Sequence, residues 1–128
     1  MKSEAFIKSI KTNVHDSSVS GVVETLTHPS GRKPPKRVAE LSAWFCSLSA
    51  SDRARVEQVI QFAVHSSIFG LLAVVDGVRA VEGGHADGSF ELSYRRGDKH
   101  DILTGASQEM LHDIYQSEIY EQVFGSAN

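Results

Sequence analysis

The sequence of 128 residues predicts a single α+β domain that is mostly helical. We expect four to five helices around a long apolar central helix, with one antiparallel β-hairpin before the C-terminal helix. The stretch from Val56 to Val81 is too apolar to form an exposed surface. Residues 90–95 alternate apolar and polar side chains, as a half-buried strand does, and residues 110–124 return to helical spacing.

The N-terminal part of the chain predicts three helices separated by breaks. The first helix starts with Ser3 as its N-cap, and a break at residues 15–18 precedes a short second helix that Pro29 ends. Residues 28–37, HPSGRKPPKR, predict an exposed basic loop rich in proline and glycine. A third helix with an apolar stripe around Trp44 follows this loop.

The Asp76-Gly77 pair in the central segment allows two interpretations. An Asp-Gly pair between β-branched residues is typical of a hairpin turn. Helical spacing of the apolar residues, and some 20 preceding positions without turn residues, instead favour one helix. We expect this helix to be capped by Ser49 or Ser51 and to continue to about Glu82, and the hairpin turn remains the alternative.

The predicted hairpin follows the central helix. A strand around Phe90, Leu92 and Tyr94 reaches a tight turn at residues 96–99, and residues 100–103 return as its partner.

Four residues of the central segment form a candidate ligand site. Asp76, Arg79 and Glu82 are three positions apart, so on a helix they share one side, and His65 lies about three turns earlier. Arg79 could bind an anion through paired N–H donors, with Asp76 or His65 supplying acid–base chemistry. An ion-pair network that covers the end of a buried helix is the more frequent use of such a pattern.

Other patterns give little support to an enzyme. The lone Cys46 excludes an intramolecular disulfide and a cysteine cluster for zinc. Three His-Asp pairs occur, but only His112-Asp113 lies in a predicted helix, and a metal phosphohydrolase needs further ligands beyond it. The sequence contains neither a G-x-S-x-G elbow nor a P-loop, so we expect no metal, no cofactor and no catalytic residue.

The charge is unevenly distributed along the chain. Residues 1–40 carry seven Lys/Arg against four Asp/Glu, whereas residues 41–128 carry six against twelve. An acidic C-terminal part disfavours nucleic acid and favours a basic partner. The basic loop lacks interleaved aromatic residues and a following recognition helix, so specific nucleic-acid binding is not expected.

The N-terminal segment does not resemble a targeting sequence. Charged residues interrupt its apolar positions, unlike the apolar core of a secretory signal. The continuous apolar centre, residues 68–75, is much shorter than the roughly 20 residues that span a bilayer. We therefore expect a soluble, cytoplasmic protein that does not engage a membrane.

Several segments together resemble a group of small, uncharacterised bacterial proteins. These are PPKR before the Trp44 helix, SASDRARVEQVI, FGLLAVVDGVRAVEGG, FELSYRRGD and EMLHDIY. The resemblance covers roughly residues 20–120, and F-G-L-L-x-x-x-D-G-V-R is its most specific part. It implies a bacterial cytoplasmic protein with the same order of helices and hairpin, and it supplies no activity or substrate.

The leading hypothesis is a non-enzymatic protein-binding module, of the immunity or antitoxin type. Asp113, Glu118 and Glu121 would contact a basic partner, with Tyr94, Tyr115 or Tyr120 as aromatic anchors. The alternative is a small-molecule binder or enzyme with an anion-binding site at Asp76, Arg79 and Glu82. Homodimerisation through the apolar helices is a third hypothesis.

Overall fold

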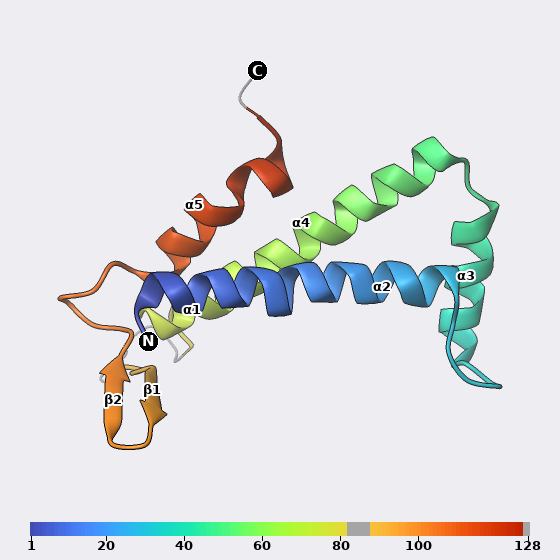
Figure 1. Cartoon of the computed structure of the whole chain (residues 1–128). Coiled ribbons are helices and arrows are strands. Elements are labelled where there is room, and N and C mark those ends of the chain that lie inside the picture. Colours follow the sequence, from blue (N-terminus) through green and yellow to red (C-terminus); the bar gives the residue numbers. More distant parts are fainter. Residues whose placement is uncertain (82–87, 127–128) are drawn as a thin grey trace.

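A computed structural model describes residues 1–81 and 88–126 of the chain. Within these residues the molecule consists of four continuous helices and one two-stranded antiparallel sheet (Figure 1). The predicted α+β class, with its long apolar helix and its hairpin before the last helix, is confirmed. The elements are α1 (Ser3–Ile10), η1 (Lys11–Asp16), α2 (Ser17–Thr27), α3 (Lys36–Ser47), α4 (Ala50–Val75), β1 (Ser93–Arg96), β2 (Lys99–Ile102) and α5 (Leu111–Phe124).

The first two predicted helices are one continuous helix, and the predicted break at residues 15–18 is wrong. A π-helical segment, η1, occupies this region, and the residues at both of its ends keep right-handed helical dihedral angles. Asp and Ser favour helix ends in isolation, but here the fully buried His15 anchors the segment to α4 and α5. Lys2, not Ser3, is the N-cap, and the Ser3 hydroxyl donates to the carbonyl of Leu103 at 3.1 Å.

The central helix α4 begins as expected and ends earlier than predicted. Ser49 is its N-cap, and its hydroxyl accepts the Asp52 N–H at 3.1 Å. The helix ends at Val75, so the prediction that it continues to about Glu82 is wrong, and Asp76-Gly77 is not a hairpin turn either. The pair closes α4 in a Schellman motif: Gly77 has φ +80°, its N–H donates to Val74, and the Val78 N–H donates to Ala73.

The hairpin has the predicted tight turn and a shorter first strand. Ser93 pairs with Ile102 and Arg96 with Lys99, while Gly97 takes a positive φ of 58° in the turn. One further backbone hydrogen bond, from Leu103 to Leu92, connects the sheet to the core.

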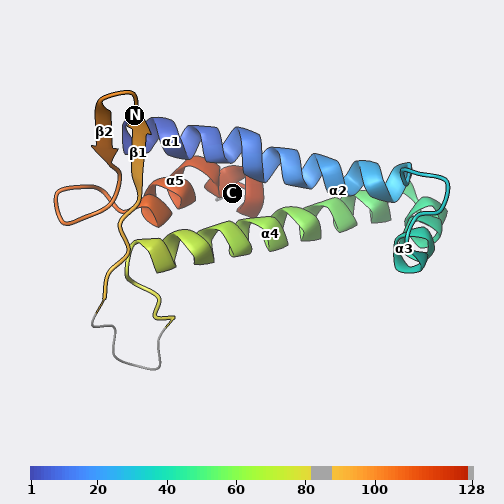
Figure 2. The same cartoon turned by 90° about the horizontal axis from the view of Figure 1, so that it is seen from below.

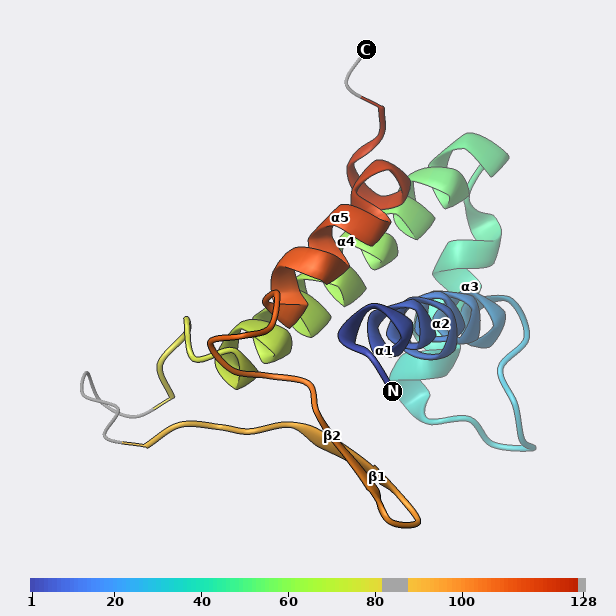
Figure 3. The same ribbon diagram turned by 60° about the vertical axis from the view of Figure 1, so that its left-hand side comes forward.

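The core lies where α1, the C-terminal end of α4 and α5 meet. Its buried members are Ile7, Leu72, Leu103, Leu111, Ile114, Tyr115 and Ile119. The hairpin and the N-terminus lie at this end of the molecule, and α3 lies at the other (Figure 1). Figure 2 shows α2 and α4 running side by side between the two ends, and Figure 3, seen close to the long axis of α1 and α2, shows the hairpin projecting from the bundle.

Helix α4 is apolar but mostly exposed. By length and composition it could cross a membrane, contrary to the expectation from residues 68–75 alone, and one such helix is weak evidence for a membrane protein. A core helix with this composition is normally buried, yet only 22% of its most apolar stretch is buried here. Much apolar surface is therefore left uncovered by the described part of the chain.

Candidate functional site

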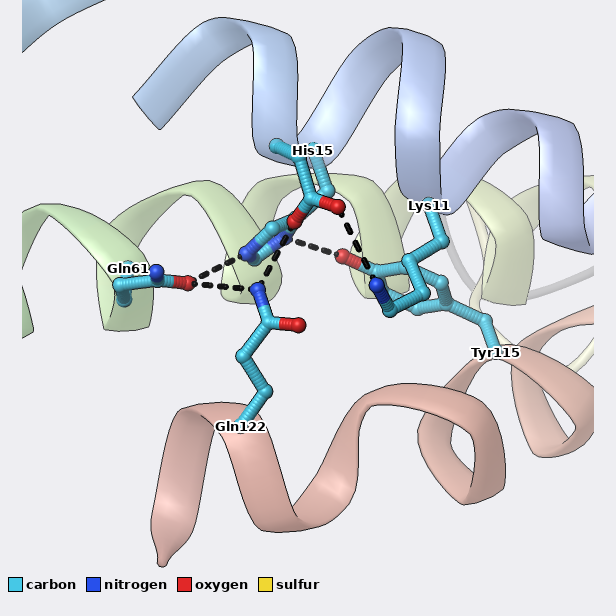
Figure 4. Close-up of polar contacts among 6 residues, drawn as sticks. Lys11, His15, Gln61, Tyr115 and Gln122 are labelled. Atoms are coloured by element: carbon cyan, nitrogen blue, oxygen red, sulfur yellow. Dashed lines mark hydrogen bonds and ion pairs between the residues drawn. The ribbon is translucent and has the colours of Figure 1, made fainter. Parts of the chain in front are cut away.

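Three helices contribute to a polar network inside the bundle (Figure 4). His15 of η1 is fully buried, with its Nδ1 2.8 Å from the Tyr115 hydroxyl of α5 and its Nε2 2.7 Å from Gln61 Oε1 of α4. An amide oxygen only accepts, so Nε2–H donates to Gln61, and in the tautomer that carries its proton on Nε2 the Tyr115 hydroxyl donates to Nδ1. Burial raises the pKa of Tyr115, which keeps this hydroxyl a donor.

The network continues to a charged pair at its edge. Gln122 Nε2 donates to Asp16 Oδ1 at 2.8 Å, and Lys11 Nζ lies 3.1 Å from Asp16 Oδ2. Burial opposes ionisation of Asp16, but the hydrogen bonds from Gln122 and Lys11 outweigh it, so the pKa of this carboxyl is lowered. His15 and Tyr115 are fully buried, so a substrate could not reach them. This suits a structural junction between helices better than a reaction centre.

His65, a predicted site residue, lies beside this network. Its ring stacks on Tyr115 with a centroid distance of 5.2 Å and meets the edge of Phe124 at 5.1 Å. Its buried Nδ1 has no hydrogen-bond partner within the described part of the chain. Burial lowers the pKa of His65; a hydrogen bond with Gln116 opposes this shift, and the nearby His15 adds to it. His65 therefore belongs to an aromatic stack, about 16 Å along the helix from Asp76.

Asp76 joins the end of α4 to the start of α5. Its nearly buried carboxylate accepts the backbone N–H groups of Leu111 at 3.1 Å and His112 at 2.8 Å, and His112 Nδ1 lies 2.6 Å away. Leu111 and His112 are the first two residues of α5, so Asp76 caps that helix from another element. We call this arrangement the Asp76 clamp.

Arg79 does not join Asp76 on a helix face. Arg79 lies beyond the end of α4, where its backbone N–H donates to Ala73 at 3.2 Å. Its guanidinium covers Gly70, in the space that a Cβ at that position would need. Glu82 lies outside the described residues. The helix side predicted to be shared by Asp76 and Arg79 is therefore incorrect, because α4 has already ended at Val75.

The surroundings of Asp76 do not favour an anion. A cavity of about 350 Å³ borders it, between the turn after α4 and the segment before α5. Its described lining includes Glu91 and Glu109 together with Asp76, and no Lys or Arg. An anion would meet negative charge there without a neutralising cation. Anion binding at Arg79 stays an untested prediction.

The predicted acidic residues of α5 lie on the surface of a helix that also carries exposed aromatic side chains. Asp113, Glu118 and Glu121 are all exposed. Tyr120 packs against Phe124 at 4.9 Å, and Phe124 meets the edge of Phe62 at 5.7 Å. These three rings, hereafter the aromatic patch, remain 42–53% exposed. Of the other two expected anchors, Tyr94 is exposed on the hairpin, whereas Tyr115 is fully buried and cannot contact a partner.

Sequence reasoning missed His15, Gln61, Phe62 and Phe124. The only signal was indirect: polar His15 and Gln61 occur in otherwise apolar helical patterns, which is where a buried network would place them. Phe124 has the helical spacing of a core residue in the last helix, and Phe62 lies within the apolar central segment.

Within residues 1–81 and 88–126, no three His, Cys, Asp or Glu side chains come together as a metal site would require. No model of a protein family, no curated protein and no solved structure matches this chain. Its fold and candidate sites are therefore interpreted from its own residues.

Proposed function

We propose that this chain is a non-enzymatic protein-binding module that engages a basic partner through the aromatic patch and the acidic residues of α5. The observation that supports it best is the exposure of Phe62, Tyr120 and Phe124, which pack on one another while leaving about half of each side chain in solvent. Exposed aromatic clusters are typical anchors of protein interfaces.

The charge beside the patch indicates the chemistry of the partner. Helix α5 carries Asp113, Glu118 and Glu121 and has no Lys or Arg. A basic partner would gain long-range attraction during encounter and ion pairs around the aromatic contact. An immunity or antitoxin type of binding protein, which needs no chemistry of its own, is the class that we propose for this chain.

The test is a charge reversal with a matched control. In affinity capture, the unaltered chain should retain a basic partner. Glu118→Lys with Glu121→Lys should abolish this retention, and Tyr120→Ala should weaken binding of the partner independently. Glu24→Lys with Glu57→Lys changes the net charge equally on exposed residues of α2 and α4 and should leave recovery intact.

Equal loss of partner recovery in both double variants would mean that binding depends on net charge alone and not on the acidic residues of α5. Full retention in the first pair and in Tyr120→Ala would refute the proposed surface. Circular dichroism of each variant establishes that the helices are intact.

A further inference from the structure

The molecule exposes more surface than a folded chain of its size should. A monomer of 14.0 kDa is expected to expose about 6,700 Å², whereas this chain exposes 9136 Å². The excess is about 2,400 Å², and the projecting hairpin accounts for part of it (Figure 3). An obligate dimer buries about 1,000–2,500 Å² on each partner, so the excess is of the size that a second copy covers.

Part of the exposed apolar surface is away from the aromatic patch, along η1 and α2. Val14, Ser18 and Val22 are four positions apart and form a ridge, with Val14 and Val22 more than 40% exposed. A shallow groove on one side of this ridge lies against α4 and includes Ala63 and Ser67. A second groove, further along α2, lies against α3 and includes Leu41. Ser18 lines both grooves, so ridge and grooves form one surface, which we call the open face.

The open face is suited to pair with itself. In a two-fold interface the same patch meets its own copy, so it must carry both a protruding and a receiving feature. Here the ridge of one copy can enter the groove of the other, as ridges enter grooves wherever helices pack. The small side chains of Ala63 and Ser67 keep the groove beside α4 open to such an approach.

The charge pattern also favours a second copy over an unlike partner. All residues that line the two grooves are uncharged, and α4 has no charged residue from Gln58 to Val75. A patch with charge of a single sign would meet the same sign on its own copy and be repelled, whereas an uncharged patch meets no such repulsion. The acidic surface of α5 does not meet this condition, because it would face a second acidic surface.

We infer that the chain is a homodimer whose two copies pack through the open face. This inference does not depend on the proposed partner of the aromatic patch, because it concerns a different surface. The exposed apolar side chains of this face, Val14, Val22 and Leu41, would then be buried between the copies.

The test is the mass of the full chain in solution, by sedimentation equilibrium over a wide range of concentration. We expect twice the mass of 14.0 kDa. Val22→Lys places a charge at the centre of the face, where the side chain is already 43% exposed, so the monomer fold tolerates it and the mass should fall to that of one chain. Val78→Lys makes the same change on a side chain 54% exposed beyond the end of α4, and it should leave the dimer intact.

Several results would overturn the inference. A single-chain mass at all concentrations, or a dimer that resists both Val22→Lys and Leu41→Lys, would exclude the open face as the interface. Co-flotation of the unaltered chain with neutral phosphatidylcholine vesicles, together with a single-chain mass in their absence, would assign the apolar surface to lipid instead. Circular dichroism separates loss of the dimer from loss of the fold.

Discussion

The Asp76 clamp makes a sharp prediction about stability. In Asp76→Ala the backbone N–H groups of Leu111 and His112, and the His112 ring, lose the acceptor that now lies within 2.6–3.1 Å. Loss of a helix cap costs about 0.5–2 kcal/mol, and a hydrogen bond to a charged group contributes about 1.5–3 kcal/mol. These terms overlap, so we expect Asp76→Ala to lower the free energy of unfolding by about 2–4 kcal/mol.

The assay is urea denaturation followed by circular dichroism. A loss of this size is a large share of the roughly 5–15 kcal/mol that stabilises a domain, and it should lower Tm by about 7–15 °C. Asp76→Asn retains one acceptor oxygen at the same place and should fall between the unaltered chain and Asp76→Ala. The comparison variant is Asp113→Ala, which removes an exposed carboxylate from the first turn of the same helix. It loses only the contact of Asp113 with His112 Nε2, at 3.3 Å, and leaves the three hydrogen bonds of Asp76 in place.

The reasoning fails on either of two results. A loss below about 1 kcal/mol in Asp76→Ala would mean that water replaces the carboxylate without cost. Equal losses in Asp76→Ala and Asp113→Ala would mean that any negative charge near the helix start suffices, and that the three directed hydrogen bonds contribute nothing.

Two further predictions concern the buried network. Because burial lowers the pKa of His65 below its unfolded value of 6.5, the unfolded chain binds more protons, and stability should fall as the pH drops from about 7 toward the folded pKa. His65→Phe keeps a ring on Tyr115 and should flatten this decline in unfolding experiments between pH 7 and 5; an unchanged slope would assign it to other groups. Tyr115→Phe removes the donor to His15 and leaves a buried nitrogen unpaired, so it should cost about 1–3 kcal/mol by urea denaturation. An unaltered midpoint would show that the hydroxyl contributes no net stability.

Local patterns predicted those features that depend on nearby residues. Ser49 caps α4 because its hydroxyl reaches an N–H three positions along, and the tight turn of the hairpin needs only Gly97 at positive φ. The period of two around Leu92 and the apolar run of α4 depend likewise on local spacing.

The features that sequence reasoning missed depend on contacts far apart in the chain. His15 and Tyr115 are 100 positions apart, and the residues around either one do not indicate that the two are in contact. The end of α4 was placed too late because Val78 and Val81 continue the apolar spacing, whereas Asp76 is drawn to the start of α5, which begins 35 positions later. Because α4 ends before Asp76, the spacing of three between Asp76 and Arg79 does not place them on one side of a helix.

The π-helical segment has a consequence for the phase of the long N-terminal helix. Ile7 and Val19 are both buried although 12 residues separate them, and in an uninterrupted α-helix they would point about 120° apart. The wider turn of η1 takes up much of this difference, so one rod can present apolar side chains to α5 at its start and to α3 and α4 further on. Removing one residue from η1 would rotate the two ends against each other and could not satisfy both sets of neighbours. The number of residues in this rod is therefore fixed, so that even one inserted or deleted residue would misalign its two ends. Neither of its α-helical parts alone would impose this constraint.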